Sequence, residues 1–192
     1  MRLPLIAPAD LTSEQRPLYE DMRAGIGSGF RGFVTERDDG ALVGPWNPWL
    51  HEPGIGHAVW ELTKALSAKA ALPDPCRQIA ILVTGAHFRA GYEIYAHVAV
   101  AQADGLSDET IATIVAGRQR PADLPRDQAI AYDTAAALSG GGVQPALNYR
   151  LAQDAFGAHG VAELIHLVGL YCVVSVTLNG FDVPVPDNAG AG

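Results

Sequence analysis

The feature of this 192-residue chain that most constrains its fold is an apolar run near the carboxyl end, LVGLYCVVSVTL at residues 167–178. The run is too short to span a bilayer, which takes about 20 consecutive apolar residues in a helix. It therefore predicts a buried helix, which we place at 159–180. Because the segment from Leu164 to Leu178 is apolar almost all round, we expect this helix to lie in the core and also in a contact between subunits.

Capping residues, prolines and glycines divide much of the remaining chain into further helices. Asp74-Pro75 is a strong helix start, because a proline at the first helical position loses no hydrogen bond. Gly91 and Gly105 separate successive helices, and Ser107 caps the next one. Other helices are expected over 12–25, 55–70, 125–139 and 144–156. No pair of segments has the pattern of paired strands, so the sequence predicts an all-α fold.

Two segments of the amino-terminal part are predicted to be irregular. GIGSGFRGF at 25–33 is rich in glycine, but no strand precedes it and no Gly-Lys-Ser closes it, which disfavours a phosphate-binding loop. GPWNPWLHEPG at 44–54 is rich in turn residues, and its Trp46 and Trp49 either cover the mouth of a pocket or pack against an amino-terminal arm. We predict an arm and first helix over 1–45, a helical domain over 46–184 and a flexible tail over 185–192.

Composition excludes several classes of partner. The net charge is −8 and no cluster of Lys or Arg occurs, which argues against binding to nucleic acid. No basic start followed by an apolar run is present, so we expect no signal peptide and no membrane partner. Cys76 and Cys172 lie far apart in predicted helices, which favours reduced thiols in a cytoplasmic protein.

An acid and a histidine stand four residues apart in YEIYAHVAVAQA at 92–103. Glu93 and His97 therefore share one face of a helix and can touch. The alternative is a solvated ion pair of little value, but the surrounding alanines, valines and tyrosines indicate a largely enclosed helix. A carboxylate beside the ring favours the imidazolium and fixes its tautomer, so we predict that His97 is a proton donor oriented by Glu93.

The order and spacing of four segments resemble the carboxymuconolactone decarboxylase family, whose wider group includes the alkylhydroperoxidase D-like proteins. The segments are RQIAIL (77–82), YEIYAH (92–97), GLSDETI (105–111) and ELIHLVGLYCVVSVTLNGF (163–181). The resemblance covers about residues 40–184, together with the opening RLPLIAP. It implies an all-α fold of packed helix hairpins, assembled as a homo-oligomer, usually a trimer or a hexamer.

The peroxidase branch of this group differs from the chain at its redox residues. In that branch a glutamate precedes a Cys-x-x-Cys, and a histidine follows the second cysteine by four residues. Counted back from His97, these positions hold Gln78, Ala90 and Glu93. An alanine and a glutamate cannot perform thiolate chemistry on peroxide.

The decarboxylase branch carries Glu-x-x-x-His, which Glu93 and His97 match. The resemblance therefore implies a lyase or isomerase that needs no cofactor and acts on a small unsaturated, carboxylated or lactone substrate. In such a reaction the unsaturation takes up the electrons as carbon dioxide leaves, and an acid reprotonates the dienolate. Two other classes remain open: a thiol-dependent peroxidase and a non-catalytic binding or assembly protein.

Several other polar or aromatic residues are candidates for the site. The candidate substrate-binding residues are Arg89, His87, Trp46 and Tyr92. Arg89 either pairs with a substrate carboxylate or is a surface residue at a helix end. His87 would be a third metal ligand beside the Glu-His pair, but no His-x-x-His spacing supports one, so we expect no metal. His166 and Asn179, on the terminal helix, are expected to be polar groups of the core or of a subunit contact.

Overall fold

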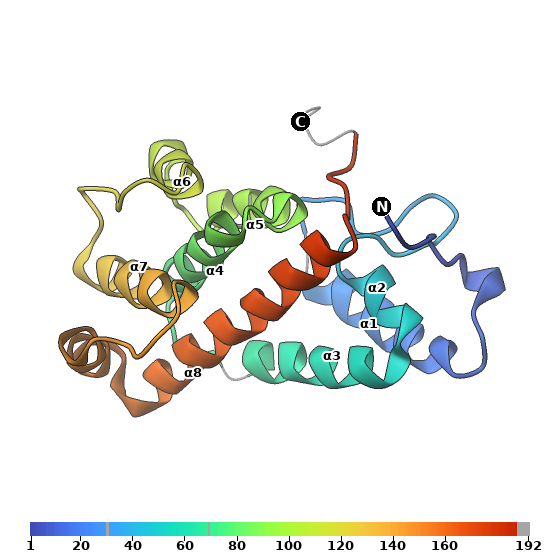
Figure 1. Cartoon of the computed structure of the whole chain (residues 1–192), viewed down its shortest axis with the longest axis horizontal. Helices are drawn as coiled ribbons and strands as arrows, with labels where there is room; N and C mark the ends of the chain where they lie inside the picture. Colours follow the sequence, from blue (N-terminus) through green and yellow to red (C-terminus); the bar gives the residue numbers. More distant parts are fainter. Residues whose placement is uncertain (30, 69, 188–192) are drawn as a thin grey trace.

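The computed structural model describes residues 1–29, 31–68 and 70–187, and the regular structure in these ranges is helical (Figure 1). A short 3-10 helix, η1, spans Pro8–Asp10. The α-helices are α1 (Gln15–Gly29), α2 (Trp46–His51), α3 (Pro53–Ala68), α4 (Asp74–Phe88), α5 (Gly91–Ala103), α6 (Asp108–Val115), α7 (Arg126–Ser139) and α8 (Ala146–Gly180). The predicted all-α fold is confirmed. Residues 188–192 of the predicted tail lie outside the described residues, and the domain boundaries stay predictions.

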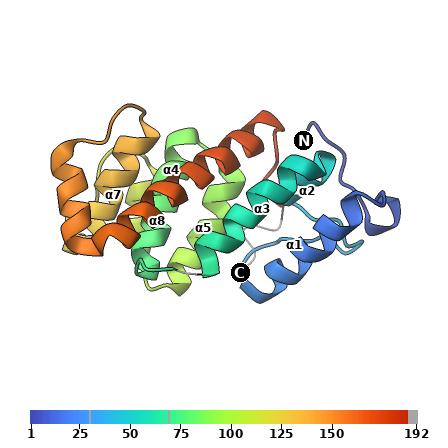
Figure 2. The ribbon, with the colours of Figure 1, turned by 90° about the horizontal axis from the view of Figure 1, so that it is seen from below.

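The helices form two groups that share α8. Helix α4 packs against α5, α6, α7 and α8, while α1, α2 and α3 pack against one another. Figures 1 and 2 show α8 running diagonally past both groups, and it contacts α3 as well as α4, α5 and α7. Helix α8 supplies Leu164 and Leu167 to the core around α4, and Leu170 and Val174 to the core around α1 to α3. A site between the two groups is therefore bordered by α8.

Helix α1 continues further than the sequence predicts. The glycine-rich segment from residue 25 is predicted to be a loop, but α1 extends to Gly29. The reason is a close contact with α3, because a Cβ on Gly25 would lie 2.5 Å from Cζ2 of the buried Trp60. Glycine at this position lets the two helices approach, at the known cost in helix propensity.

The amino-terminal arm is docked on α2. The predicted turn-rich segment 44–54 contains this short helix, in which Trp46 and Trp49 are both buried. The fully buried side chain of Asn47 accepts a hydrogen bond from Ile6 N at 3.1 Å and donates one to Pro4 O at 3.1 Å. These bonds satisfy the buried amide and attach the arm.

Helix α8 spans both of the predicted terminal helices. It breaks at Gly157, where φ is 67°, between the predicted segments 144–156 and 159–180. By length and composition this helix is also long and apolar enough to cross a membrane, but half of its most apolar window is buried among the other helices. The predicted place of the apolar run in the core is confirmed.

The exposed face of α8 supports a prediction about assembly. Val173 and Val176 are 46% and 57% exposed, whereas Leu170 and Val174 face the core. If a second copy packs here, the protein will sediment as an oligomer at micromolar concentration. Val176→Asp will then shift it towards the monomer, because the contact would bury an unpaired carboxylate. Gln153→Asp, an exposed change on the same helix, should not affect assembly, and a stable wild-type monomer would contradict the prediction.

Candidate functional site

A hairpin of α4 and α5 carries the predicted acid and histidine. Helix α4 ends where Arg89 takes a left-handed conformation (φ 53°) and donates its N–H to Ala86 O at 3.1 Å. Helix α5 starts two residues later and returns along α4. A Cβ on Gly85 would lie 3.3 Å from Cγ of Glu93, so the two helices approach closely at this level. The hairpin therefore places the side chains of α5 against the middle of α4.

Glu93 and His97 are in contact, as predicted. Oε1 of Glu93 lies 3.1 Å from Nε2 of His97, and Nδ1 of His97 lies 2.8 Å from Oε1 of Gln78 on α4. Glu93, His97 and Gln78 are 3%, 7% and 8% exposed. Tyr171 of α8 packs edge to face on the imidazole, with ring centroids 5.0 Å apart. The pair is therefore buried, which excludes the solvated ion pair.

Burial makes the uncharged forms of both side chains the stable ones. The 3.1 Å contact is not aligned as a hydrogen bond, and Oε1 of Glu93 has no hydrogen-bond partner among the described residues. Burial raises the pKa of Glu93 to about 8. Burial, with a smaller contribution from the positive charge of Arg77, lowers the pKa of His97 to about 3. These shifts favour an uncharged imidazole and a proton on Glu93 near neutral pH, in place of the expected imidazolium beside a carboxylate.

Two cavities meet at His97. An outer pocket of about 460 Å³ lies between α1, α3, α4, α5 and α8, and an inner cavity of about 30 Å³, room for about one water, adjoins it. His97, Tyr171, Leu170 and Thr63 line both. The outer pocket is also lined by the polar residues Lys64, Ser67, Arg77 and Gln78. The inner cavity is also lined by Phe33, Trp46, Trp49, Tyr92 and Glu93.

A buried ion pair holds a cation at the outer pocket. Nη1 of Arg77 on α4 bonds to Oε1 of Glu163 on α8, and these side chains are 12% and 7% exposed. Oε2 of Glu163 accepts the backbone N–H of Leu72 at 3.1 Å and also that of Ala71. Glu163 therefore positions both the guanidinium and the segment between α3 and α4.

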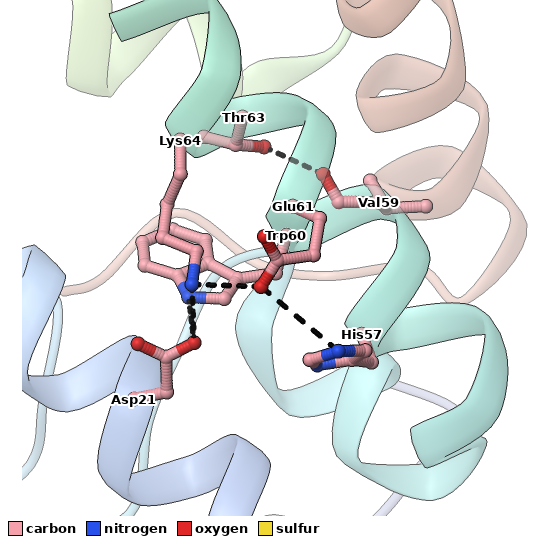
Figure 3. A network of polar contacts seen from close by, with 7 residues as sticks. All are labelled: Asp21, His57, Val59, Trp60, Glu61, Thr63 and Lys64. Atoms are coloured by element: carbon pink, nitrogen blue, oxygen red, sulfur yellow. Dashed lines mark hydrogen bonds and ion pairs between the residues drawn. The ribbon is translucent and has the colours of Figure 1, made fainter. Parts of the chain in front are cut away.

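A second cation, Lys64, stands at the rim of the same pocket. Figure 3 shows its ammonium group between two carboxylates, 2.7 Å from Oδ2 of Asp21 and 2.7 Å from Oε1 of Glu61. Trp60 donates its indole N–H to the same oxygen of Asp21 at 3.0 Å, and His57 lies 3.9 Å from Glu61. The network joins α1 to α3, and its hydrogen bonds, first to Asp21 and then to Glu61, raise the pKa of Lys64. Lys64 is therefore held in place and positively charged.

Solved structures share this arrangement of helices. A variant of the debrominase Bmp8 in complex with 2,3,4-tribromopyrrole aligns with a TM-score of 0.72 at 12% identity, over 100% of this chain and 95% of that chain. An alkylhydroperoxidase AhpD core, an uncharacterised peroxidase-related protein from Ralstonia eutropha, aligns with a TM-score of 0.72 at 14% identity, over 98% and 93% of the two chains. The chain has the AhpD fold.

A third solved structure has the same fold, and the comparisons leave the activity open. A protein of unknown function from Agrobacterium tumefaciens aligns with a TM-score of 0.62 at 16% identity, over 73% of this chain and 96% of that chain. The sequence matches no family model and no curated protein. The predicted AhpD-like fold is confirmed, but identities this low show the fold alone.

The thiols of this AhpD fold are poorly suited to peroxide chemistry. The resemblance places the redox cysteines at Ala90 and Glu93, neither of which is a cysteine. Sγ of the buried Cys76 lies 3.7 Å from Oδ2 of Asp127, and burial raises the pKa of this thiol to about 12. Burial also raises the pKa of Cys172. Both side chains are therefore thiols, not nucleophilic thiolates, near neutral pH.

The structure brings two of the four predicted substrate-binding residues to the site. Trp46 and Tyr92 line the inner cavity, with their rings edge to face at 6.4 Å. Arg89 and His87 are exposed at the end of α4 and line neither of these cavities, so their role in substrate binding stays a prediction. His97 packs at Gln78, about three helical turns along α4 from Arg89, and Glu93 packs at Gly85. No group of three or more His, Cys, Asp or Glu residues in the described ranges could hold a metal ion.

The two polar residues predicted on the terminal helix are exposed rather than buried. Nδ1 of His166 lies 2.6 Å from Ala162 O, and the side chain of Asn179 donates to Phe88 O at 2.7 Å. Neither is a buried polar group of the core, and a role in a subunit contact stays a prediction.

Sequence reasoning missed the residues that α3, α4 and α8 bring to the pocket. These are Lys64, Arg77 and Tyr171, which line the pocket, and Glu163, which pairs with Arg77. Three of them lie in segments that the sequence analysis singles out. Arg77 directly precedes Gln78, Glu163 is the acid at the start of the apolar terminal segment, and Tyr171 is the aromatic residue inside that segment. Lys64 carries no such signal, because a lysine on an amphipathic helix is ordinarily a solvated residue.

Proposed function

We propose that this chain is an enzyme that transfers protons on a small unsaturated carboxylated or lactone substrate, as a lyase of the decarboxylase type or as an isomerase. The observation that carries the proposal is a buried carboxyl group, Glu93, which lines the inner cavity and contacts His97, the residue at the junction of the two cavities. A buried acid that keeps its proton near neutral pH is typical of a general acid. The resemblance to the decarboxylase branch supports the same assignment.

The residues of the site can supply both steps of such chemistry. In a lyase reaction the bond from carbon to the carboxylate breaks, carbon dioxide leaves, and the electron pair enters the conjugated unsaturation to give a dienolate. Glu93 then delivers its proton to carbon and recovers one from solvent. In an isomerase reaction Glu93, in contact with His97, supplies its proton to one carbon, and the resulting carboxylate removes a proton from another. Neither step needs a cofactor.

The outer pocket fits a small carboxylated or lactone substrate. Its volume of about 460 Å³ is within the range of small-molecule sites. Arg77 and Lys64 line it, and although carboxylates of the protein balance their charges, both offer N–H donors to a substrate oxygen. The described bond to Glu163 uses Nη1 of Arg77, one nitrogen of a group with five N–H donors, and guanidinium binds carboxylate well. These residues take the role that the sequence assigns to Arg89.

The proposal is tested by a screen of small unsaturated carboxylic acids and lactones in D₂O. A lyase will release carbon dioxide and leave one deuterium in the product. An isomerase will release no carbon dioxide, and its product will carry deuterium taken up from the solvent. The matched control is the folded Glu93→Gln variant, which has no transferable proton at this position. Binding of these compounds without turnover would instead favour a non-catalytic binding protein.

A thiol-dependent peroxidase is the alternative, since one structural neighbour is peroxidase-related. We expect the wild-type protein, with a dithiol reductant, to consume peroxide no faster than the double variant Cys76→Ala/Cys172→Ala. The double variant should lose some stability, because Cys76 is fully buried, but keep the proposed turnover within a few fold. If the wild type consumes peroxide and the folded double variant does not, the thiol-dependent peroxidase is favoured over the proton-transfer enzyme.

A further inference from the structure

The side chain of Gln78 connects His97 to a carboxylate at the end of α5. Its Oε1 lies 2.8 Å from Nδ1 of His97, and its amide is close enough to Asp104 to interact with that carboxylate. Burial raises the pKa of Asp104, and the interaction with Gln78 opposes the rise. Because a carboxylate only accepts, the NH₂ group of Gln78 faces Asp104 and its carbonyl oxygen faces His97.

This orientation of the amide decides which nitrogen of His97 carries a proton. A carbonyl oxygen only accepts, so Nδ1 of His97 must be the donor in the 2.8 Å contact. An uncharged imidazole has one N–H group, so Nε2 has none. Nε2 is the nitrogen that lies 3.1 Å from Oε1 of Glu93, and the side chain that can give it a proton is the carboxylic acid.

The charged and titratable groups around the pair support the uncharged form. Those groups are Arg77 of α4, Tyr92 of α5, Asp104 at the end of α5, Tyr171 and Glu163 of α8, and Lys64 of α3. Arg77 repels an imidazolium, and Glu163 neutralises Arg77 instead of His97. Burial raises the pKa of both tyrosines, so neither supplies a negative charge near neutral pH. An ion pair between Glu93 and His97 would therefore place two charges in a site with little else to solvate them.

We infer that Gln78, oriented by Asp104, is a positioning residue that fixes His97 as the Nδ1–H tautomer and thereby makes Glu93 the proton donor of the site. A glutamate at position 78 would place a negative charge beside Nδ1 and favour the imidazolium, whereas the amide accepts the same hydrogen bond without a charge. The role in catalysis rests on the proposed function. The tautomer does not, because it follows from hydrogen bonds within the protein.

The tautomer is measured by NMR on protein labelled with ¹⁵N in its histidines. The chain has six histidines, so the signals of His97 are identified by their loss in a His97→Gln variant. At pH 7 we expect a protonated Nδ1 and a bare Nε2. Two protonated nitrogens would show an ion pair, and a protonated Nε2 alone would show the opposite tautomer, and either result would overturn the inference. This measurement needs no variant of Gln78 and no substrate.

Gln78→Leu tests the positioning role. Without the carbonyl oxygen, Nδ1 has no acceptor, so we expect the proton to move to Nε2, where Glu93 can accept it. With a substrate from the screen, kcat should fall about a hundredfold with little change in KM, the lower end of what acid–base catalysis contributes. The control is Gln102→Leu, which removes an exposed amide of α5 that bonds to Asp108 at 2.8 Å. An unchanged tautomer in folded Gln78→Leu would overturn the inference, even if the proposed reaction is not found.

Discussion

His97→Ala is expected to lower kcat by roughly a hundredfold to ten-thousandfold, the usual contribution of general acid–base catalysis. The imidazole lines both cavities and is in contact with Glu93 and Gln78, so its loss removes the partner that holds the acid in place. Turnover is measured on a substrate from the D₂O screen, with circular dichroism and sedimentation to show that fold and assembly are intact. The matched control is His166→Ala, which removes an exposed histidine of α8 that lines neither cavity.

Glu93→Gln is expected to cost as much as His97→Ala. The sequence predicts a smaller loss and a shift of the activity profile to lower pH, because it makes Glu93 an orienting carboxylate. In the structure Glu93 holds the proton, and an amide cannot release one. Wild-type activity should therefore fall as the pH rises through about 8, where Glu93 ionises. The double variant should be little worse than either single variant, since residues that act as a unit are not additive.

Stability against pH gives a check on Glu93 that needs no substrate. Its pKa is raised in the folded protein from an ordinary value of 4.5 to about 8, so the folded state holds a proton that the unfolded state releases. The free energy of unfolding should therefore decline as the pH rises between these values, and this decline should be smaller in Glu93→Gln.

If both single variants, His97→Ala and Glu93→Gln, remain folded and turn over substrate like the wild type, the pair is structural and the proton-transfer proposal loses its main support.

The helices could be predicted because their signals are local. Oγ of Ser107 accepts the N–H of Thr110 at 3.2 Å, as a cap predicted from the sequence should. Gly91 and Gly157 likewise mark a helix start and a helix break where the sequence places them. The error at Gly25 has a tertiary cause, since the closeness of Trp60 cannot be read from residues near 25.

The candidate site could be predicted only as far as one helix determines it. The contact of Glu93 with His97 follows from a spacing of four residues, which is a property of α5 alone. Their charge states could not be predicted from α5, because these depend on burial by α4 and α8. Arg89 is close to the pair in sequence, but the turn places it on the surface. Arg77 was missed because the hairpin that brings it to the pocket is a tertiary feature.

Glu163→Leu is expected to cost about 3–5 kcal/mol of unfolding free energy, the usual result of breaking a buried ion pair from one side. The change would leave the guanidinium of Arg77 buried without its counter-charge. It would also leave the N–H groups of Ala71 and Leu72 without their acceptor. Urea unfolding measures the loss. The matched control is Asp133→Ala in the exposed pair with Arg120, whose side chains are 41% and 45% exposed and which should cost at most about 1 kcal/mol.

The double variant Arg77→Leu/Glu163→Leu separates the structural role of this pair from its role in the pocket. Replacing both partners with apolar groups removes the uncompensated charge, so the part of the stability lost through that charge should return. The part that comes from the N–H groups of Ala71 and Leu72 should not, because their acceptor is still missing. Turnover should not return, because Arg77 is one of two cations that line the outer pocket. If Glu163→Leu loses no more unfolding free energy than Asp133→Ala, the Arg77–Glu163 ion pair does not stabilise the fold. A double variant that is stable but inactive would show that Arg77 is needed at the pocket for its charge.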